Sequence, residues 1–208
     1  MTPIILKRYT TLPVLLDLLK RKRLVLLDPA SWEDKNDSAI LLEYKKRRKV
    51  DQVFALCFSQ GDETIHHWKT FADGISGCCI EFDGKKLTEI LGQHPDLRHG
   101  PVVYRKIGYL ANHSIKVDRI PFTKRWPYRC EEEYRVIWEG SSSNACYEVE
   151  IDLRAITRIT ISQKMPAPVY NTIREYLREA FRDPDKRISR STLYENRVWI
   201  DKFKSKES

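Results

Sequence analysis

Two glutamates and an arginine alternate in the run Glu131-Glu132-Glu133-Tyr134-Arg135. If this segment is extended, Glu131, Glu133 and Arg135 project from one face, because successive side chains of a strand point to opposite sides. Two carboxylates beside a guanidinium could act on a proton or stabilise a developing positive charge. The same side chains could instead form an ion-pair network that only positions strands.

A second acidic group contains Asp34, Asn36 and Asp37, in a stretch that is typical of a polar loop. Together with Glu131 or Glu133, these residues could hold Mg²⁺ for phosphodiester cleavage, because this ion takes oxygen ligands. A simple polar turn accounts for the same residues without a metal. Both interpretations stay open at this point.

The net charge is +8, from 37 Lys and Arg against 29 Asp and Glu, and it favours anionic partners such as nucleic acid. Residues 1–50 hold twelve of the basic residues against six acidic ones, although such runs could also be solvated helix ends. No apolar run approaches the roughly 20 residues that span a bilayer, and residues 1–8 do not resemble a signal peptide. We therefore expect a cytoplasmic protein with no membrane partner.

The five cysteines form no C-x-x-C pair and have no nearby histidine at metal spacing, so we expect neither disulfides nor structural zinc.

Strand and helix patterns interleave without a regular βαβ rhythm. This predicts one α+β domain over residues 1–208, with a mixed, mostly antiparallel β-sheet core and flanking helices. Helices are predicted after Thr11 and over 39–49, 64–73 and 169–181. Strands are predicted over 4–9, 24–27, 53–59, 78–82, 102–107, 134–138, 147–153, 156–161 and 197–203. We also expect antiparallel pairing across the Ser/Asn loop at 140–144.

Several stretches resemble an uncharacterised bacterial domain family, called Abi-like because of its neighbours in phage-defence loci. In chain order they are Leu6–Thr10, Trp32–Asp37, Leu56–Ser59, Trp68, Gly77, Ile80–Asp83, Val103-Tyr104, Trp126 and Glu131–Arg135. They cover most of the chain, with a departure from the family pattern at 127–130. The resemblance implies a defence or toxin-type effector with a cognate defence-system or antitoxin partner. It does not imply a particular enzymatic activity.

The layout also resembles that of ADP-ribosyltransferases, with a basic residue on an early strand, a central strand ending in serine, and a late glutamate beside a strand. The resemblance implies NAD as the substrate. Glu133 would then hold the ribose hydroxyl and steady an oxocarbenium-like centre, with Glu131 as its rival or as the base for an acceptor. Arg8 would bind the diphosphate through its planar fork, and Ser59 would orient a ribose.

Tyr9, Trp68 and Arg135 complete the expected NAD contacts, and no metal site is assigned. Core or cleft-wall packing is the competing interpretation for Trp68 and for Trp126. His66 and His67 are expected to be exposed residues of a helix, with metal ligation or proton transfer as the alternative.

The leading interpretation is an effector that transfers ADP-ribose from NAD to nucleic acid or protein, or that hydrolyses NAD. A metal-dependent nuclease is the first alternative. The second is a non-catalytic module that binds nucleic acid or a partner through basic patches and surface aromatics.

Overall fold

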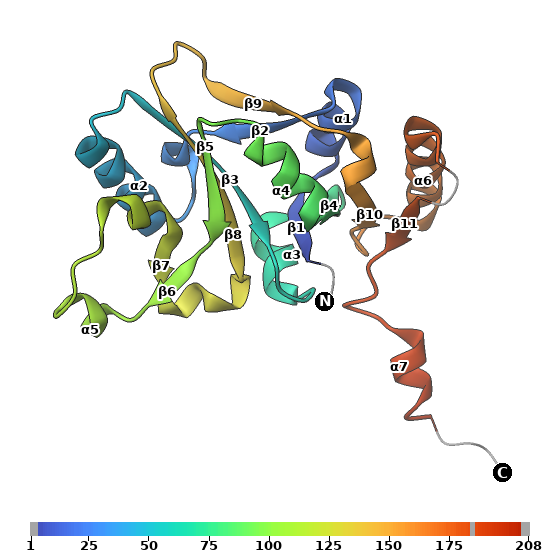
Figure 1. The fold of residues 1–208 in the computed structure, drawn as a ribbon. Helices are drawn as coiled ribbons and strands as arrows, with labels where there is room; N and C mark the ends of the chain where they lie inside the picture. The colour runs from blue at the N-terminus through green and yellow to red at the C-terminus, as the bar shows by residue number, and fades with distance from the viewer. Residues whose placement is uncertain (1–3, 184–185, 205–208) are drawn as a thin grey trace.

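A computed structural model describes residues 4–183 and 186–204 of the chain (Figure 1). Its strands are β1 (Ile5–Thr11), β2 (Arg23–Leu27), β3 (Gln52–Ser59), β4 (Gly77–Asp83), β5 (Leu97–Pro101), β6 (Val103–Arg105), β7 (Thr123–Arg125), β8 (Glu133–Gly140), β9 (Cys146–Glu150), β10 (Ile156–Ile161) and β11 (Arg187–Arg190).

The α-helices are α1 (Leu12–Arg21), α2 (Lys35–Arg48), α3 (Ile65–Phe71), α4 (Gly84–Gly92), α5 (Ile107–Leu110), α6 (Ala167–Phe181) and α7 (Arg197–Asp201). Four 3₁₀ segments connect them: η1 (Pro29–Ser31), η2 (Val117–Phe122), η3 (Trp126–Glu131) and η4 (Leu153–Ala155). None of the helices in the described ranges is long and apolar enough to cross a membrane.

The main sheet follows the order β11-β10-β4-β1-β3-β2-β9, and β8 pairs with both β3 and β5. Its pairs are antiparallel except for β10 with β11, and β6 and β7 form a separate parallel pair. The predicted α+β class with a mixed, mostly antiparallel sheet is therefore confirmed.

The sheet is weakly joined along one edge of β3, where β1 and β2 meet it. Strand β1 pairs with β3 only at Lys7 and Ser59, and β2 pairs with β3 only at Leu27 and Ala55. By contrast, β3 and β8 pair along their whole length, from Gln52 opposite Gly140 to Ser59 opposite Glu133. The strands beside β3 thus diverge and leave an opening in the sheet.

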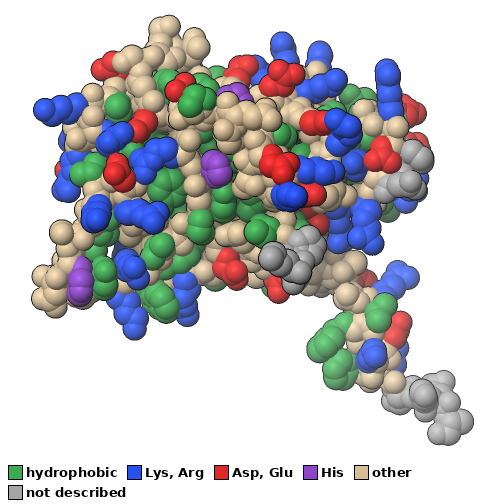
Figure 2. Space-filling view, viewed as in Figure 1, with side chains coloured by type: hydrophobic (Ala, Val, Ile, Leu, Met, Phe, Trp, Pro, Cys, Tyr) green, Lys and Arg blue, Asp and Glu red, His purple; other side chains and the backbone are tan. Residues whose placement is uncertain are grey.

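Both faces of the sheet are covered. Leucines of α1, α4 and α6 join the large core on one face, including Leu15, Leu87 and Leu177. On the other face, α2 packs through Leu41 and Tyr44, and α3 packs through Trp68 against Tyr9. Figure 2 shows Lys and Arg side chains spread over the visible surface, and α7 standing away from the body with apolar side chains around it.

The structure differs from the sequence prediction at two capped helices, α4 and α7, and in the pairing of β8 and β9. No helix is predicted after the strand at 78–82, but Asp83 caps α4 by accepting hydrogen bonds from the amides of Lys85 and Lys86. Asn196 caps α7, so residues 197–203 begin as a helix and not as a strand. Strand β8 pairs with β3 and β5, and β9 pairs with β2, so the predicted pairing across the Ser/Asn loop is absent.

Further differences concern helix starts and the strand predicted over 102–107. Asp34 caps α2 by accepting from the amides of Asn36 and Asp37, so the helix starts at Lys35 and the predicted polar loop is shorter. The strand predicted over 102–107 is confirmed at β6, but it ends at Arg105 and α5 begins at Ile107. Strand β5 before it was not predicted, and Val102 between the two strands donates its amide to the carbonyl of Glu133. Thr11 is the N-cap of α1, but its side chain makes no capping hydrogen bond.

Candidate functional site

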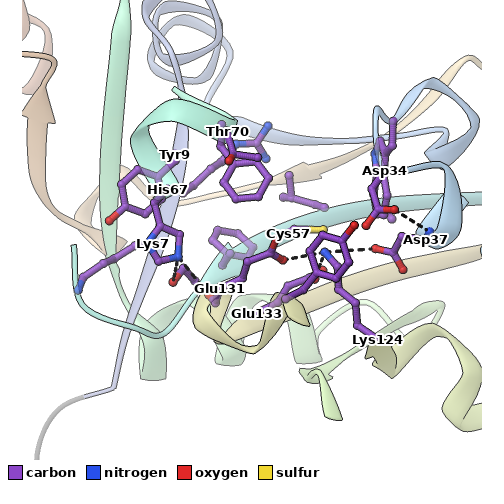
Figure 3. A pocket seen from close by; sticks show the side chains of 18 of the residues that line it. Lys7, Tyr9, Asp34, Asp37, Cys57, His67, Thr70, Lys124, Glu131 and Glu133 are labelled. Carbon is purple, nitrogen blue, oxygen red and sulfur yellow. Dashed lines mark hydrogen bonds and ion pairs between the residues drawn. The ribbon is translucent and has the colours of Figure 1, made fainter. Parts of the chain in front are cut away.

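A cavity of about 340 Å³ lies where the sheet opens beside β3 (Figure 3). Its volume is within the range of small-molecule sites, which is roughly 300–1,000 Å³. Strands β1, β2 and β3, helix α3 and the segment from β7 to β8 all contribute side chains to its lining. The divergence of β1 and β2 from β3 is therefore what makes room for a ligand.

Five charged side chains meet on one side of the cavity, and we call them the charge cluster: Asp37, Lys124, Glu131, Glu133 and Arg135. The Nζ atom of Lys124 lies 2.7 Å from Glu131, 3.2 Å from Glu133 and 3.6 Å from Asp37. Arg135 lies 2.6 Å from a carboxylate oxygen of Glu133 and 2.6 Å from one of Asp37. Each carboxylate of the cluster therefore binds at least one cation.

A left-handed turn brings the two glutamates together. Glu131 ends η3, Glu132 adopts a φ of 41°, and Glu133 begins β8. The extended run expected from Glu131 onward is thus wrong at its start, because the chain turns at Glu132. Both carboxylates nevertheless reach Lys124.

Burial and neighbouring cations give the two glutamates different acidities. Burial alone would raise the pKa of Glu133, but Arg135 and Lys124 outweigh it and lower this pKa to about 2. Burial raises the pKa of Glu131, and Lys124 offsets that effect only in part. Glu133 is therefore a permanent anion at neutral pH, whereas Glu131 takes up a proton more readily than an ordinary glutamate.

Arg8 lies in the same cavity and differs sharply from the cluster. Its Nη1 atom is buried and has no hydrogen-bond partner among the residues that the structure describes. Burial lowers the pKa of the guanidinium to about 10, and the titratable groups that act on it are the thiols of Cys57 and Cys78, which burial keeps neutral by raising their pKa. A buried donor without a partner costs about 1–3 kcal/mol, so this cation is suited to an anion supplied by a ligand.

A hydrogen-bonded histidine supports the wall between β1, β3 and α3. His67 is 1% exposed, and its Nε2 lies 3.2 Å from Ser59 Oγ and 3.3 Å from the carbonyl of Glu131. Because a carbonyl can only accept, Nε2 carries the proton, and Nδ1 accepts from the hydroxyl of Thr64 at 2.8 Å. Burial lowers the pKa of His67, which keeps the ring neutral.

The Ser59 hydroxyl oxygen also accepts from the amide of Gly61 at 3.1 Å, so its own hydrogen is free to face the cavity. Tyr9 stacks on the His67 ring, with centroids 4.8 Å apart. The expectation that His67 is exposed is therefore wrong, whereas His66 is exposed as expected.

The cavity brings together five of the seven predicted site residues: Arg8, Tyr9, Ser59, Glu131 and Glu133. Arg135 is fully buried behind Glu133 and Asp37, so it positions carboxylates and does not line the cavity. Trp68 is also outside the lining; it is 3% exposed, packs edge-on against Tyr9, and donates to Glu63 at 2.7 Å. Both residues therefore contact side chains that line the cavity but do not line it themselves.

Lys124 is the main residue that the sequence did not indicate. It stands in the short run Thr123-Lys124-Arg125, where no pattern distinguishes it from the many other lysines. Only the tertiary placement of β7, which pairs with β6 and contacts η3, sets its ammonium among three carboxylates.

No protein-family model matches the chain, and no curated protein matches it either. The resemblance to the Abi-like family therefore stays a prediction.

Three solved structures of DarT from Thermus sp. 2.9 are similar to it, with NAD⁺, with carba-NAD⁺ and with ADP-ribosylated single-stranded DNA. Identity is 9–10%, coverage is 94% of this chain and 98–100% of theirs, and the TM-scores are 0.48, 0.47 and 0.49 respectively. A likeness of this degree assigns neither a fold family nor an activity.

Proposed function

We propose that the chain is an NAD-consuming enzyme that transfers ADP-ribose to an acceptor or to water. One observation carries this proposal: a single cavity holds the cation Arg8, whose Nη1 has no partner among the described residues, and two buried carboxylates, Glu131 and Glu133. The diphosphate of NAD is an anion that suits Arg8, and the ribose next to the cationic nicotinamide ring suits the two carboxylates.

Arg8 would bind the diphosphate, since its free Nη1 has room for a charge-assisted hydrogen bond and a guanidinium fits phosphate oxygens. The aromatic wall formed by Tyr9, His67 and Phe71 would contact the nicotinamide ring. The Ser59 hydroxyl would donate to a ribose oxygen. Because the cavity is near the lower end of the usual size range, the adenosine end of the substrate would extend out of it.

Glu133 would stabilise the ribosyl centre in the transition state. When the bond between the ribose carbon and the nicotinamide nitrogen breaks, its electron pair leaves with neutral nicotinamide and positive charge develops on the ribose. An ionised carboxylate near this centre lowers the barrier, and a pKa of about 2 keeps Glu133 ionised at every working pH.

Glu131 would act as the base. The acceptor's nucleophilic atom forms a bond to the ribose carbon and gives its proton to the Glu131 carboxylate. A carboxyl group whose pKa is raised by burial accepts a proton better than a free one, because the proton-transfer driving force increases. With water as the nucleophile, the same steps release ADP-ribose.

The nuclease alternative is weakened by the position of Lys124. Its ammonium lies within 3.6 Å of the carboxylates of Asp37, Glu131 and Glu133, where a divalent ion would have to bind. Asp34 is engaged as the cap of α2. No group of three or more His, Cys, Asp or Glu suited to a metal ion occurs in residues 4–183 and 186–204.

The test is nicotinamide release from NAD by the purified chain, with EDTA present throughout and with single-stranded DNA, RNA or protein added in separate reactions. We expect turnover that is lost in Glu133→Gln and retained in Glu132→Gln, whose side chain is exposed and next in sequence. No release by the wild-type chain under any condition would overturn the proposal.

The role of toxin or defence effector, and the antitoxin partner that it implies, rest on the family resemblance. If the chain consumes NAD in cells, its induced expression should stop growth and lower cellular NAD. Glu133→Gln should abolish both effects at equal protein level.

A further inference from the structure

The segment from β5 to η3 is strongly basic. Residues 97–130 contain eight Lys or Arg and one acidic residue, Asp118. Figure 2 shows Lys and Arg side chains over α5, β6 and β7, at the lower left, among apolar ones. The segment has a net charge of +7, and Lys124 is its only basic residue in the lining of the proposed NAD cavity.

Exposed aromatic rings stand among these cations. Trp126 is 41% exposed, with the Nζ atom of Lys106 at 5.6 Å and the guanidinium of Arg129 at 5.0 Å from its ring centroid. Tyr109 is 38% exposed and has the guanidinium of Arg105 at 4.6 Å. We call the surface formed by Arg47, Arg105, Lys106, Tyr109, Arg125, Trp126 and Arg129 the basic face.

The basic face has little charge compensation. Among its five cations, only Arg47 has an ion pair within the described ranges, with Glu43 at 2.8 Å. Arg105 and Arg125 are register partners across β6 and β7, and with Arg47 they border a groove of about 390 Å³. The Nε atom of Arg125 is buried there without a partner in the part of the chain that is described.

The groove and the NAD cavity are adjacent. Lys124 lines both of them, and η3 carries Trp126 and Arg129 on the basic face but Tyr128 and Glu131 in the cavity lining. A polymer that lies on the basic face is therefore next to the carboxylate that would act as base.

We propose that the basic face binds single-stranded nucleic acid and presents it as the acceptor. Unpaired cations bind the phosphates, and exposed rings stack on bases, which only unpaired bases allow. Contacts to phosphates and stacking on bases do not depend on the sugar, so the face binds DNA and RNA strands alike. The acceptor role rests on the proposed function, whereas the binding does not.

The test is binding of fluorescent single strands of dT and rU, and of a duplex, by the full chain without NAD over a range of salt concentrations. We expect both single strands to bind with similar affinity and more tightly than the duplex. Five cations predict a slope of log K against log salt that is no steeper than about −3.5. Trp126→Ala should weaken binding by about tenfold, because one stacked base contributes about 1–3 kcal/mol.

The matched pair of double variants decides whether the site is specific. Lys106→Glu with Arg129→Glu removes two exposed cations of the basic face, and Lys86→Glu with Arg178→Glu removes two exposed cations on α4 and α6. We expect more than a tenfold loss in the first variant and little change in the second. Equal losses in both, tighter duplex binding, or no binding by wild type would each overturn the proposal.

NAD turnover without acceptor, measured on the same proteins, separates the two proposals. Binding of single strands without any NAD turnover would leave the basic face standing and remove the enzyme proposal. NAD turnover without binding of single strands would support the enzyme proposal and remove the proposal for the basic face.

Discussion

Two buried guanidinium groups, Arg8 in the cavity lining and Arg135 behind it, have opposite surroundings. Arg135 is 0% exposed and has carboxylates on two sides, whereas Arg8 has a buried Nη1 with no partner within the described residues. Burial lowers the pKa of both, but in Arg135 the neighbouring Glu133 and Asp37 reverse the effect and raise it. A buried charge with its counter-ions built in serves the fold, and one without them is ready for a ligand.

The largest expected effect is the loss of stability in Arg135→Met. Removing one partner of a buried charge network leaves Asp37 and Glu133 uncompensated, which costs about 3–5 kcal/mol. Equilibrium unfolding in urea measures it, with Arg129→Met as a control at an exposed arginine. A loss below about 1 kcal/mol would show that Arg135 is not needed to compensate these carboxylates.

Glu133→Gln should have the largest effect on catalysis. The amide keeps the shape of the side chain but removes the charge that would face the ribosyl centre, so we expect nicotinamide release to fall on the order of 10²–10³-fold. Circular dichroism of the folded variant separates this loss from unfolding. If the variant is folded and retains wild-type turnover, Glu133 is a structural member of the charge cluster only.

Arg8→Met should act in the opposite sense to Arg135→Met. We expect NAD to bind about 10–100-fold more weakly, because a charge-assisted contact to phosphate contributes about 1.5–3 kcal/mol. The free energy of unfolding should not fall, since no native ion pair is lost. Arg8→Lys should bind NAD with intermediate affinity. A destabilised Arg8→Met variant that binds NAD with wild-type affinity would show that Arg8 stabilises the fold and does not bind the ligand.

The smallest expected effect is a displaced pH profile in Lys124→Met. Deprotonated Glu131 is the active base, so transfer should decline as pH falls through its pKa, which burial has raised. Lys124 lowers this pKa, and its removal should move the acidic limb of the profile to higher pH. Lys124→Arg should return the acidic limb of the pH profile to its wild-type position. If the limb does not move in a folded Lys124→Met variant, Lys124 does not set the pKa of the base.

The sequence by itself determined the α+β class and most of the strands, because alternating and helical spacing of apolar residues depends on local geometry. It also singled out Arg8 on an early strand, Ser59 at the end of a central strand and two glutamates beside a late strand, and these four residues line one cavity. It missed α4, which Asp83 caps, and it predicted a strand where Asn196 caps α7.

Only the tertiary structure decided which charges meet. Lys124 joins the charge cluster through the pairing of β7 with β6 and its contact with η3, and Asp37 joins it from the first turn of α2, nearly a hundred positions away from Arg135. His67 is buried because α3 packs on β1 and β3. Such neighbours depend on register and on strand divergence between distant segments, and spacing along the chain carries no record of either.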